Sequence, residues 1–222
     1  MARALVPRVE RLVACRDRIL LGLTGPPGVG KSTLAAAVAA AYERDAGAGT
    51  AAVVGMDGFH LRQAELARRG LADVKGAPET FDADRFVSLL RRLRVPRSVT
   101  SVPVFDRGIE EPVAAALTIR PEQRLVVVEG NYLLLDDVWR PVRDLLDAVW
   151  HLHLTDDLRV PDLVARHVAH GRSPDAATEW VLRSDEANAR LVAAAAARAD
   201  AVIDMRTGEL SPPARHPRGP GR

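Results

Sequence analysis

The sequence predicts a single α/β domain with a mainly parallel, doubly wound sheet, helices on both faces of the sheet and a small helical lid. Short apolar runs alternate with longer helical patterns, which is typical of parallel strands joined by helical crossovers. One of these runs also ends in a glycine-rich turn that opens a helix. We expect the domain to span residues 1–210, with the lid near 158–175. A basic, proline-rich tail at 211–222 is expected to be disordered.

The predicted strands are short and apolar, and the predicted helices are longer and lack glycine. Residues 31–45 are rich in alanine, and residues 83–93 place their leucines and a phenylalanine on one helical face. The predicted strands are 19–24, 50–56, 124–129, 149–154 and 201–204, with 124–129 the clearest central one. The predicted helices are 9–15, 31–45, 83–93, 140–148, 158–170 and 178–198. Residues 98–105 and 116–119 are predicted to form a hairpin or an edge.

Composition narrows the class of protein. The chain has 222 residues, 47% hydrophobic and 27% charged, which suits one globular domain with a substantial core. Its formal net charge of +2 does not indicate a nucleic-acid-binding or membrane-binding protein. Residues 1–18 lack the apolar core of a signal peptide, so we expect a cytoplasmic protein without a membrane partner. The single cysteine, Cys15, excludes a disulfide framework within one chain and is expected to pack as a small core residue.

Residues 25–32 match the phosphate-binding pattern G-x-x-x-x-G-K-[ST], the P-loop, with a predicted strand before it and a helix after it. Glycines let backbone N–H groups turn toward phosphate oxygens, and the helix N-terminus adds positive charge. We expect Lys31 to reach the β- and γ-phosphates of ATP and the Ser32 hydroxyl to ligate Mg²⁺. The P-loop NTPase fold is therefore predicted, with a nucleotide held by Gly25, Pro26, Pro27, Gly28, Val29, Gly30, Lys31, Ser32 and Thr33.

Two carboxylates fall at the carboxyl ends of predicted strands, where open parallel sheets bind their ligands. Asp57 is the best candidate for the group that orients an acceptor hydroxyl and takes its proton, with capping of the following turn as the alternative. Glu129 ends a core strand, where a charge needs a partner. Mg²⁺ is one such partner, and a helix cap or a salt bridge is the other possibility. No Asn-Lys-x-Asp motif accompanies the P-loop, which argues against a GTPase.

Several further segments carry a family resemblance over residues 18–205. They are 56–60 (Met-Asp-Gly-Phe-His), 75–82 (Lys-Gly-Ala-Pro-Glu-Thr-Phe-Asp), 103–107 (Pro-Val-Phe-Asp-Arg), 128–133 (Val-Glu-Gly-Asn-Tyr-Leu), 170–173 and 184–188. On these motifs the chain resembles the P-loop kinases grouped with uridine kinase, bacterial type I pantothenate kinase and phosphoribulokinase. It is most similar to bacterial proteins labelled as a nucleoside/nucleotide kinase family or as fructose-transport kinases.

The resemblance implies a role for several residues. Asp57 aligns with the catalytic aspartate, and Ser32 and Glu129 align with residues around Mg²⁺. Residues 75–82 resemble the acceptor-binding segment, and Arg166 and Arg172 resemble lid arginines that close over the phosphates. The implied acceptor-binding residues are His60, Lys75, Asp82, Phe105 and Arg107.

The chain also departs from uridine kinases. His60 replaces their tyrosine, and the segment after Phe105 lacks their base-contacting histidine, so a pyrimidine nucleoside is not favoured. His60 either bonds the acceptor or packs as a partly buried residue.

The expected reaction joins ATP and a hydroxylated small molecule to give ADP and a phosphomonoester with Mg²⁺. The expected acceptor is a nucleoside, a sugar or a pantothenate-like compound. The alternative is a regulatory nucleotide-binding protein that hydrolyses ATP slowly. No nucleic-acid partner is expected, and a homodimer is left open.

Overall fold

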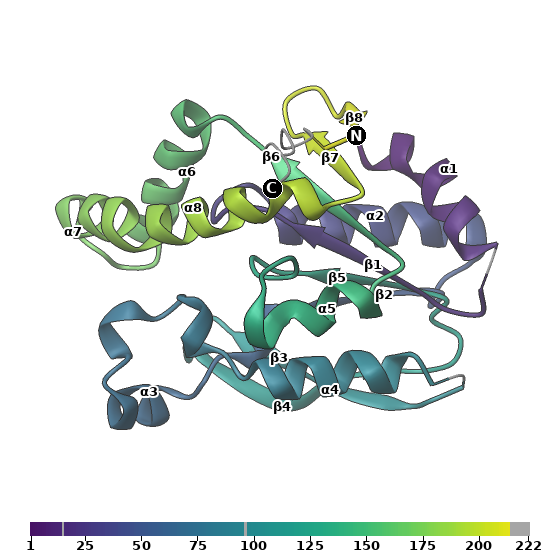
Figure 1. Cartoon of the computed structure of the whole chain (residues 1–222), viewed down its shortest axis with the longest axis horizontal. Helices are drawn as coiled ribbons and strands as arrows, with labels where there is room; N and C mark the ends of the chain where they lie inside the picture. The colour runs from purple at the N-terminus through teal and green to yellow at the C-terminus, as the bar shows by residue number, and fades with distance from the viewer. Residues whose placement is uncertain (15, 96, 214–222) are drawn as a thin grey trace, which may run out of the picture.

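The computed structural model describes residues 1–14, 16–95 and 97–213, which build one central sheet covered by helices (Figure 1). The strand order in this sheet is β2-β5-β1-β6-β7-β8. Neighbouring strands are parallel except for the last pair, β7 and β8. The strands are β1 (Ile19–Thr24), β2 (Ala51–Gly55), β5 (Leu125–Glu129), β6 (Ala148–His153), β7 (Ala201–Asp204) and β8 (Leu210–Ser211). The predicted parallel α/β sheet is thus confirmed.

Each face of the sheet has its own apolar core, because successive side chains of a strand point to opposite faces. On one face Leu21 and Leu23 pack with α1 (Ala2–Val13) and α2 (Lys31–Ala46). On the other face Leu20 packs with α4 (Ala83–Leu93) and α5 (Arg140–Leu145). All six residues of β1 are buried, as expected of a strand covered on both sides.

A separate two-stranded antiparallel sheet stands beside the end of β2. It consists of β3 (Thr100–Asp106) and β4 (Glu111–Ile119), and it confirms the predicted pairing, although the second strand starts earlier than predicted. β3 approaches the short 3₁₀ helix η1 (Met56–Phe59) very closely. A Cβ atom at Gly58 would lie 2.3 Å from the carbonyl oxygen of Pro103, so this junction requires glycine. Helix α3 (Gln63–Arg69) follows η1.

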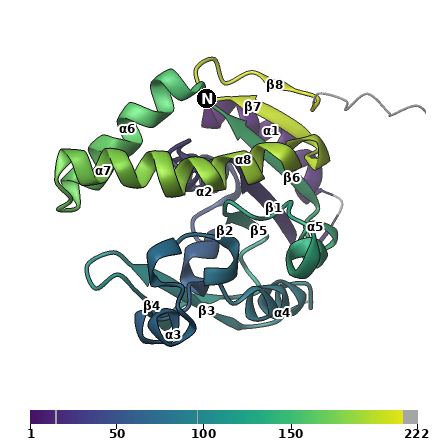
Figure 2. The ribbon, with the colours of Figure 1, turned by 60° about the vertical axis from the view of Figure 1, so that its left-hand side comes forward.

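A helical hairpin stands beside the P-loop edge of the sheet and contains the segment 158–175 that the sequence predicted as a lid. It consists of α6 (Asp156–Ala169), α7 (Pro174–Trp180) and α8 (Glu186–Ala195), and Figure 2 shows α7 and α8 running on as one long rod with α6 folded back beside it. A π-helical turn, Val181–Asp185, joins α7 to α8. The prediction of a single helix over 178–198 was therefore wrong in two respects. The helix starts earlier, at Pro174, and a π-helical turn interrupts it.

Smaller corrections concern the chain ends and one helix. α1 begins seven residues before the predicted helix start at 9 and contains Pro7, while Cys15 lies outside the described residues. α5 ends at Leu145 because residues from Ala148 onward join β6. Ser211, assigned to the tail by the sequence, belongs to β8, and residues 214–222 of that tail lie outside the described part.

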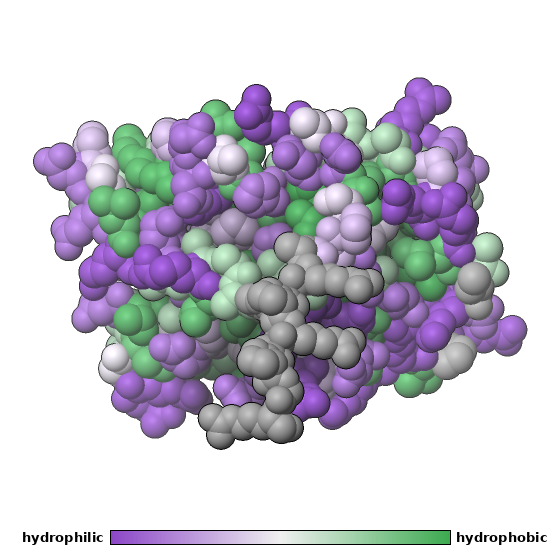
Figure 3. All heavy atoms as spheres, turned by 45° about the horizontal axis from the view of Figure 1, so that its top comes forward, coloured by the Kyte–Doolittle hydropathy of each residue, from purple (hydrophilic) through white to green (hydrophobic). Residues whose placement is uncertain are grey.

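Hydrophilic side chains cover much of the face seen in Figure 3, with hydrophobic residues in smaller groups between them. Among the residues that the structure describes, no helix combines the length and the apolar character needed to cross a bilayer.

Candidate active site

The P-loop connects β1 to α2 at the carboxyl edge of the sheet, and steric crowding explains its glycines. Gly28 and Gly30 adopt left-handed backbone angles, with φ of 81° and 89°. A Cβ at Gly25 would lie 2.8 Å from the carbonyl oxygen of Leu152 and 2.9 Å from a methyl group of Val29. Any larger residue at Gly25 would therefore push the loop away from β6.

The ammonium group of Lys31 lies beneath this loop. Its Nζ donates to the carbonyl oxygens of Gly25 at 2.9 Å and Pro26 at 3.0 Å. Burial lowers the pKa of Lys31 to about 8, against the opposing effects of Glu129 and Asp57. A compact cation therefore sits at the start of α2, where the helix also presents its positive end.

Ser32 and Glu129 meet across the β1–β5 edge. The Ser32 hydroxyl donates to Oε1 of Glu129 at 2.9 Å, and Glu129 is 8% exposed. Burial, and then the charge of Asp57, raise the pKa of Glu129, whereas Lys31 and Ser32 act in the opposite direction. A buried carboxylate beside a hydroxyl is an oxygen pair that suits Mg²⁺.

These two oxygens do not form a complete cage. Among the described residues, His, Cys, Asp and Glu side chains do not gather in any group of three that could hold an ion by themselves. Mg²⁺ commonly takes one or two protein carboxylates and completes its shell with water and substrate phosphates, so the pair fits that pattern.

Asp57 stands opposite the P-loop, in η1 directly after β2. Its side chain is 41% exposed, and its Oδ2 lies 3.4 Å from a guanidinium nitrogen of Arg107 on the hairpin side. Both residues line one pocket of about 310 Å³ with Lys31, Ser32 and Glu129. A smaller hollow of about 210 Å³ toward β3 shares four of these five residues, all but Lys31. The two hollows are therefore adjacent and share these four residues as a common wall.

Aromatic rings surround His60 on the side of this pocket that Phe81 lines. Its ring stacks on Phe81 with centroids 3.9 Å apart and lies 5.2 Å from the centroid of Phe105. Burial lowers the pKa of His60, with Asp57 acting against it. The Nδ1 atom is buried and has no hydrogen-bond partner within the described ranges. Both readings of His60, packing and polar contact, are thus compatible with its position.

Hydrogen bonds at Gly76 and at the preceding Lys75 hold the segment 75–82 in place. The Gly76 carbonyl accepts from the Tyr132 hydroxyl at 2.5 Å and from Nδ2 of Asn188 at 3.3 Å. Lys75 donates to the carbonyl of Glu110 at 3.0 Å, and its Nζ lies 5.4 Å from the centre of the Phe105 ring. This segment forms one wall of the 310 Å³ pocket through Gly76 and Phe81.

The structure brings most of the predicted residues together, but not all of them. The pocket lining includes Lys31, Ser32, Asp57, His60, Arg107, Glu129 and Arg166. Arg172 instead places its guanidinium 4.2 Å from the ring centre of Trp180. Asp82 accepts from the backbone N–H of Arg85 at 3.0 Å and caps α4, and it lines a separate 250 Å³ hollow with His60. Phe105 lines the 210 Å³ hollow.

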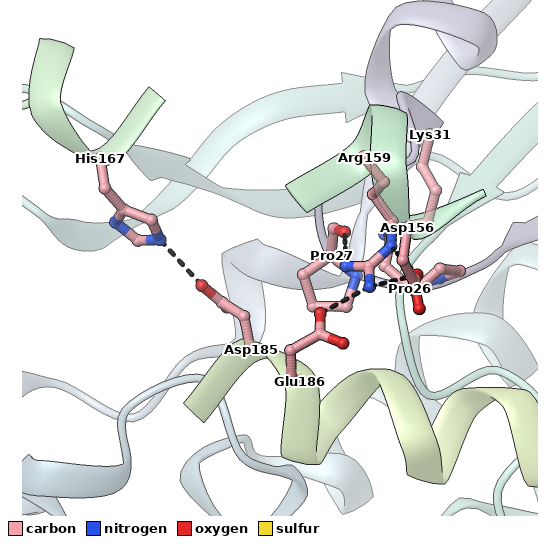
Figure 4. Close-up of polar contacts among 8 residues, drawn as sticks. All are labelled: Pro26, Pro27, Lys31, Asp156, Arg159, His167, Asp185 and Glu186. Carbon is pink, nitrogen blue, oxygen red and sulfur yellow. Dashed lines mark hydrogen bonds and ion pairs between the residues drawn. The ribbon is translucent and has the colours of Figure 1, made fainter. Parts of the chain in front are cut away.

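The sequence predicted no role for four further pocket residues, although they lie within the motif segments 128–133, 170–173 and 184–188. Asn131, His170, Asp185 and Asn188 also line the pocket. Asp185 bonds Nε2 of His167 at 2.9 Å, and burial raises the pKa of Asp185 against the effect of that histidine (Figure 4). Asn131 follows a strand end and is detectable on that ground. Asp185 sits in the π-helical turn, which the sequence does not distinguish from ordinary helix.

A family model described as "Phosphoribulokinase / Uridine kinase family" matches residues 20–210. The chain belongs to this family. A Schizosaccharomyces pombe protein provisionally named a uridine kinase is 34% identical over 193 residues, covering 83% of this chain and 82% of that protein. The sequence motifs predicted a P-loop kinase of the phosphoribulokinase/uridine kinase family, and this match confirms that prediction.

Solved structures agree with this family assignment. A crystal structure from Silicibacter, provisionally named a fructose transport system kinase, is 40% identical with a TM-score of 0.79, and the match covers 88% of this chain and 95% of that one. Phosphoribulokinase from Rhodobacter sphaeroides is 15% identical with a TM-score of 0.62, over 85% of this chain and 70% of that one. The latter likeness shows the shared fold.

Proposed function

We propose that this protein is an ATP-dependent kinase that transfers the γ-phosphoryl group to a hydroxyl of a small molecule, with Mg²⁺. The observation that carries the proposal is one 310 Å³ pocket lined by Lys31, by the Ser32–Glu129 pair and by Asp57. A phosphate-binding cation, an oxygen pair suited to Mg²⁺ and an exposed carboxylate are the groups that this transfer requires. Family membership supports the phosphotransferase class.

In this proposal the P-loop binds the triphosphate of ATP through its backbone N–H groups, and Lys31 exchanges its loop carbonyls for phosphate oxygens. Ser32 and Glu129 would hold Mg²⁺, which when bound neutralises phosphate charge. The buried position of Glu129 at the end of β5 keeps this carboxylate fixed relative to the loop.

Asp57 acts as the general base on the acceptor. It is exposed to the pocket, so an incoming hydroxyl can reach its carboxylate without displacing a buried partner. The long 3.4 Å contact to Arg107 leaves room for exchange with substrate. Asp57 therefore orients the acceptor oxygen and takes its proton as the new bond forms.

The lid supplies positive charge to the transferred group. Arg166 lines the pocket from α6, and we assign it to stabilising charge on the phosphoryl oxygens. Arg172 packs on Trp180 outside the pocket, so in this proposal it contributes only when the lid closes further.

The acceptor is proposed to lie against His60, Phe81 and Phe105, near Lys75. Flat rings beside polar groups suit a compact polyhydroxylated molecule, such as a sugar, a nucleoside or a pantothenate-like compound. The name of one relative, a fructose transport system kinase, supports a sugar within this range. The name of another, a uridine kinase, points to a pyrimidine nucleoside, which His60 and the segment after Phe105 do not favour.

A screen of hydroxylated metabolites tests the proposal. The purified protein is incubated with MgATP and each metabolite, and ADP release is compared with release in buffer alone. A kinase gives one class of acceptor that raises the rate and yields a phosphomonoester by mass spectrometry. The same slow rate with every compound of a broad panel would instead support a regulatory protein that hydrolyses ATP slowly.

A further inference from the structure

We infer that Arg159 is a positioning residue that couples the P-loop to the acceptor segment 75–82. The inference rests on the proposed binding of a nucleotide by the P-loop. Arg159 lies in the first turns of α6, and its side chain is 1% exposed. It is not among the residues that line the 310 Å³ pocket, so its effect on that pocket is exerted through the residues it holds.

One guanidinium joins three segments that are distant in sequence (Figure 4). Its Nη1 atom donates to the Pro27 carbonyl in the P-loop at 3.0 Å. Its Nε and Nη2 atoms donate to Oδ1 of Asp156 at 3.1 and 2.7 Å, at the start of α6. Nη2 also donates to Oε1 of Glu186 at 2.5 Å, at the start of α8. A planar fork with several donors suits this arrangement, and a lysine ammonium does not.

The contact with Pro27 fixes a peptide group of the phosphate cradle. The described peptide bonds are all trans, so a carbonyl and the following N–H point to opposite sides. With the Pro27 carbonyl turned to Arg159, the Gly28 N–H is turned away from α6. Close packing of Gly28 against α6 reinforces this orientation of the peptide group, since a Cβ at Gly28 would lie 3.2 Å from Cβ of Leu163 and 3.3 Å from Cγ of Arg159.

The contact with Glu186 fixes the other end of the network. Glu186 begins α8, and its neighbours Asp185 and Asn188 line the pocket. Asn188 donates to the Gly76 carbonyl at 3.3 Å. Two direct contacts, joined by the first turn of α8, thus lead from Arg159 at the P-loop to Glu186 and from Asn188 to the acceptor segment.

The buried charge of Arg159 couples the contacts on its two sides, because the guanidinium needs all of its partners at once. A buried guanidinium that loses one partner is left with an unpaired donor, which is costly in an interior. A nucleotide that holds the P-loop in place therefore also favours the arrangement in which α8 contacts Gly76. Coupling between two binding sites is reciprocal, so the acceptor strengthens nucleotide binding in the same measure.

Hydrogen exchange with mass spectrometry tests the coupling in the full chain. The probe is a non-hydrolysable ATP analogue with Mg²⁺, used at saturation, and the readout is protection of amides in 74–82. We expect the analogue to raise protection at least fivefold in the wild type. Arg159→Lys should weaken analogue binding by roughly tenfold, the equivalent of one charged hydrogen bond. It should also abolish the protection gain at saturation, as should Asn188→Ala, which leaves the P-loop contacts intact.

Arg190→Lys, an exposed change on α8, is the matched control and should keep the full gain. An unchanged gain in both Arg159→Lys and Asn188→Ala overturns the inference and reduces Arg159 to a packing residue. If Arg159→Lys does not fold, Glu186→Ala replaces it with the same expectation. A wild type that binds the analogue without added protection at 74–82 refutes the coupling alone, whereas failure to bind the analogue refutes the proposed function.

Discussion

The Ser32 hydroxyl donates to Oε1 of Glu129 across 2.9 Å, linking the first turn of α2 to the carboxyl end of β5. The two residues are 97 positions apart, and the parallel pairing of β1 with β5 brings them together. Because Glu129 is buried, its charge is stabilised chiefly by neighbours on the P-loop side. In the proposed function this pair marks the place where a metal ion would meet the nucleotide phosphates.

Glu129→Gln should raise the Mg²⁺ concentration for half-maximal activity by about tenfold or more, because the neutral amide is a weaker ligand for a hard cation. Activity is measured against free Mg²⁺ at saturating ATP. Exposed Glu122→Gln, in the turn before β5, is the control and should leave the curve in place. Full activity of the wild type in excess EDTA would contradict the assignment.

ATP affinity should fall as the pH rises through about 8, where Lys31 loses its proton. The direction of this pH dependence follows from the lowered pKa of Lys31. Burial lowers the pKa of Lys31, so the ammonium that attracts phosphates is present below pH 8 and is lost above it. Calorimetry from pH 6.5 to 9.5, in buffers of different ionisation enthalpy, should show proton uptake on ATP binding at the alkaline end.

Two variants of Lys31 separate charge from shape. Lys31→Ala should abolish turnover and remove the pH dependence of ATP binding, since the main protein cation at the phosphates is gone. Lys31→Arg keeps its charge over the same pH range and should bind ATP with a flat profile. An alkaline loss of affinity that persists in Lys31→Ala would show that another group titrates.

The lid arginines should differ in importance. Arg166 lines the pocket, so Arg166→Ala should lower kcat by about 10²-fold with a smaller effect on ATP affinity. Arg172→Ala should lower kcat less, because its guanidinium packs on Trp180 until the lid closes. Steady-state kinetics and ATP binding on the same preparations make the comparison. Losses confined to ATP affinity, with kcat unchanged, would make both arginines plain binding residues.

Gly58→Ala should destabilise the protein by about 1–3 kcal/mol, because the added methyl group meets the Pro103 carbonyl oxygen, a backbone atom that cannot move aside. Gly108→Ala is the control, since the atom nearest to its added Cβ is the side-chain oxygen of exposed Asp106. Its effect should stay within about 0.5 kcal/mol. Urea unfolding followed by circular dichroism measures both. Equal stabilities would mean that η1 and β3 are not packed as described.

Local patterns explain which parts could be predicted from the sequence. β1 and α4 have the predicted bounds, 19–24 and 83–93, because an apolar run or a helical face is encoded within each segment. The P-loop is equally local, since strand, glycines and helix are contiguous. The Ser32–Glu129 pair required one further rule, that carboxyl ends of parallel strands share an edge.

The residues that the sequence did not reveal depend on contacts between distant segments. Arg159 resembles any other helical arginine until Pro27 and Glu186 are brought to it. The role of Asp82 could not be separated from helix capping, because an N-cap and a substrate-binding carboxylate have the same residue type. Likewise, nothing in residues 174–188 marks the π-helical turn that directs Asp185 into the pocket.

The central claim is that Asp57 activates an acceptor hydroxyl, and Asp57→Asn tests it most directly. Asparagine keeps the size of the side chain but cannot take the proton, so kcat for acceptor-dependent ADP release should fall by roughly 10²-fold or more. Because Asp57 is 41% exposed and its ion pair with Arg107 is long, thermal stability and ATP affinity should stay near wild type. A collapse of stability would identify Asp57 as a structural cap. An acceptor-dependent rate near wild type, with stability and ATP affinity intact, would contradict the account.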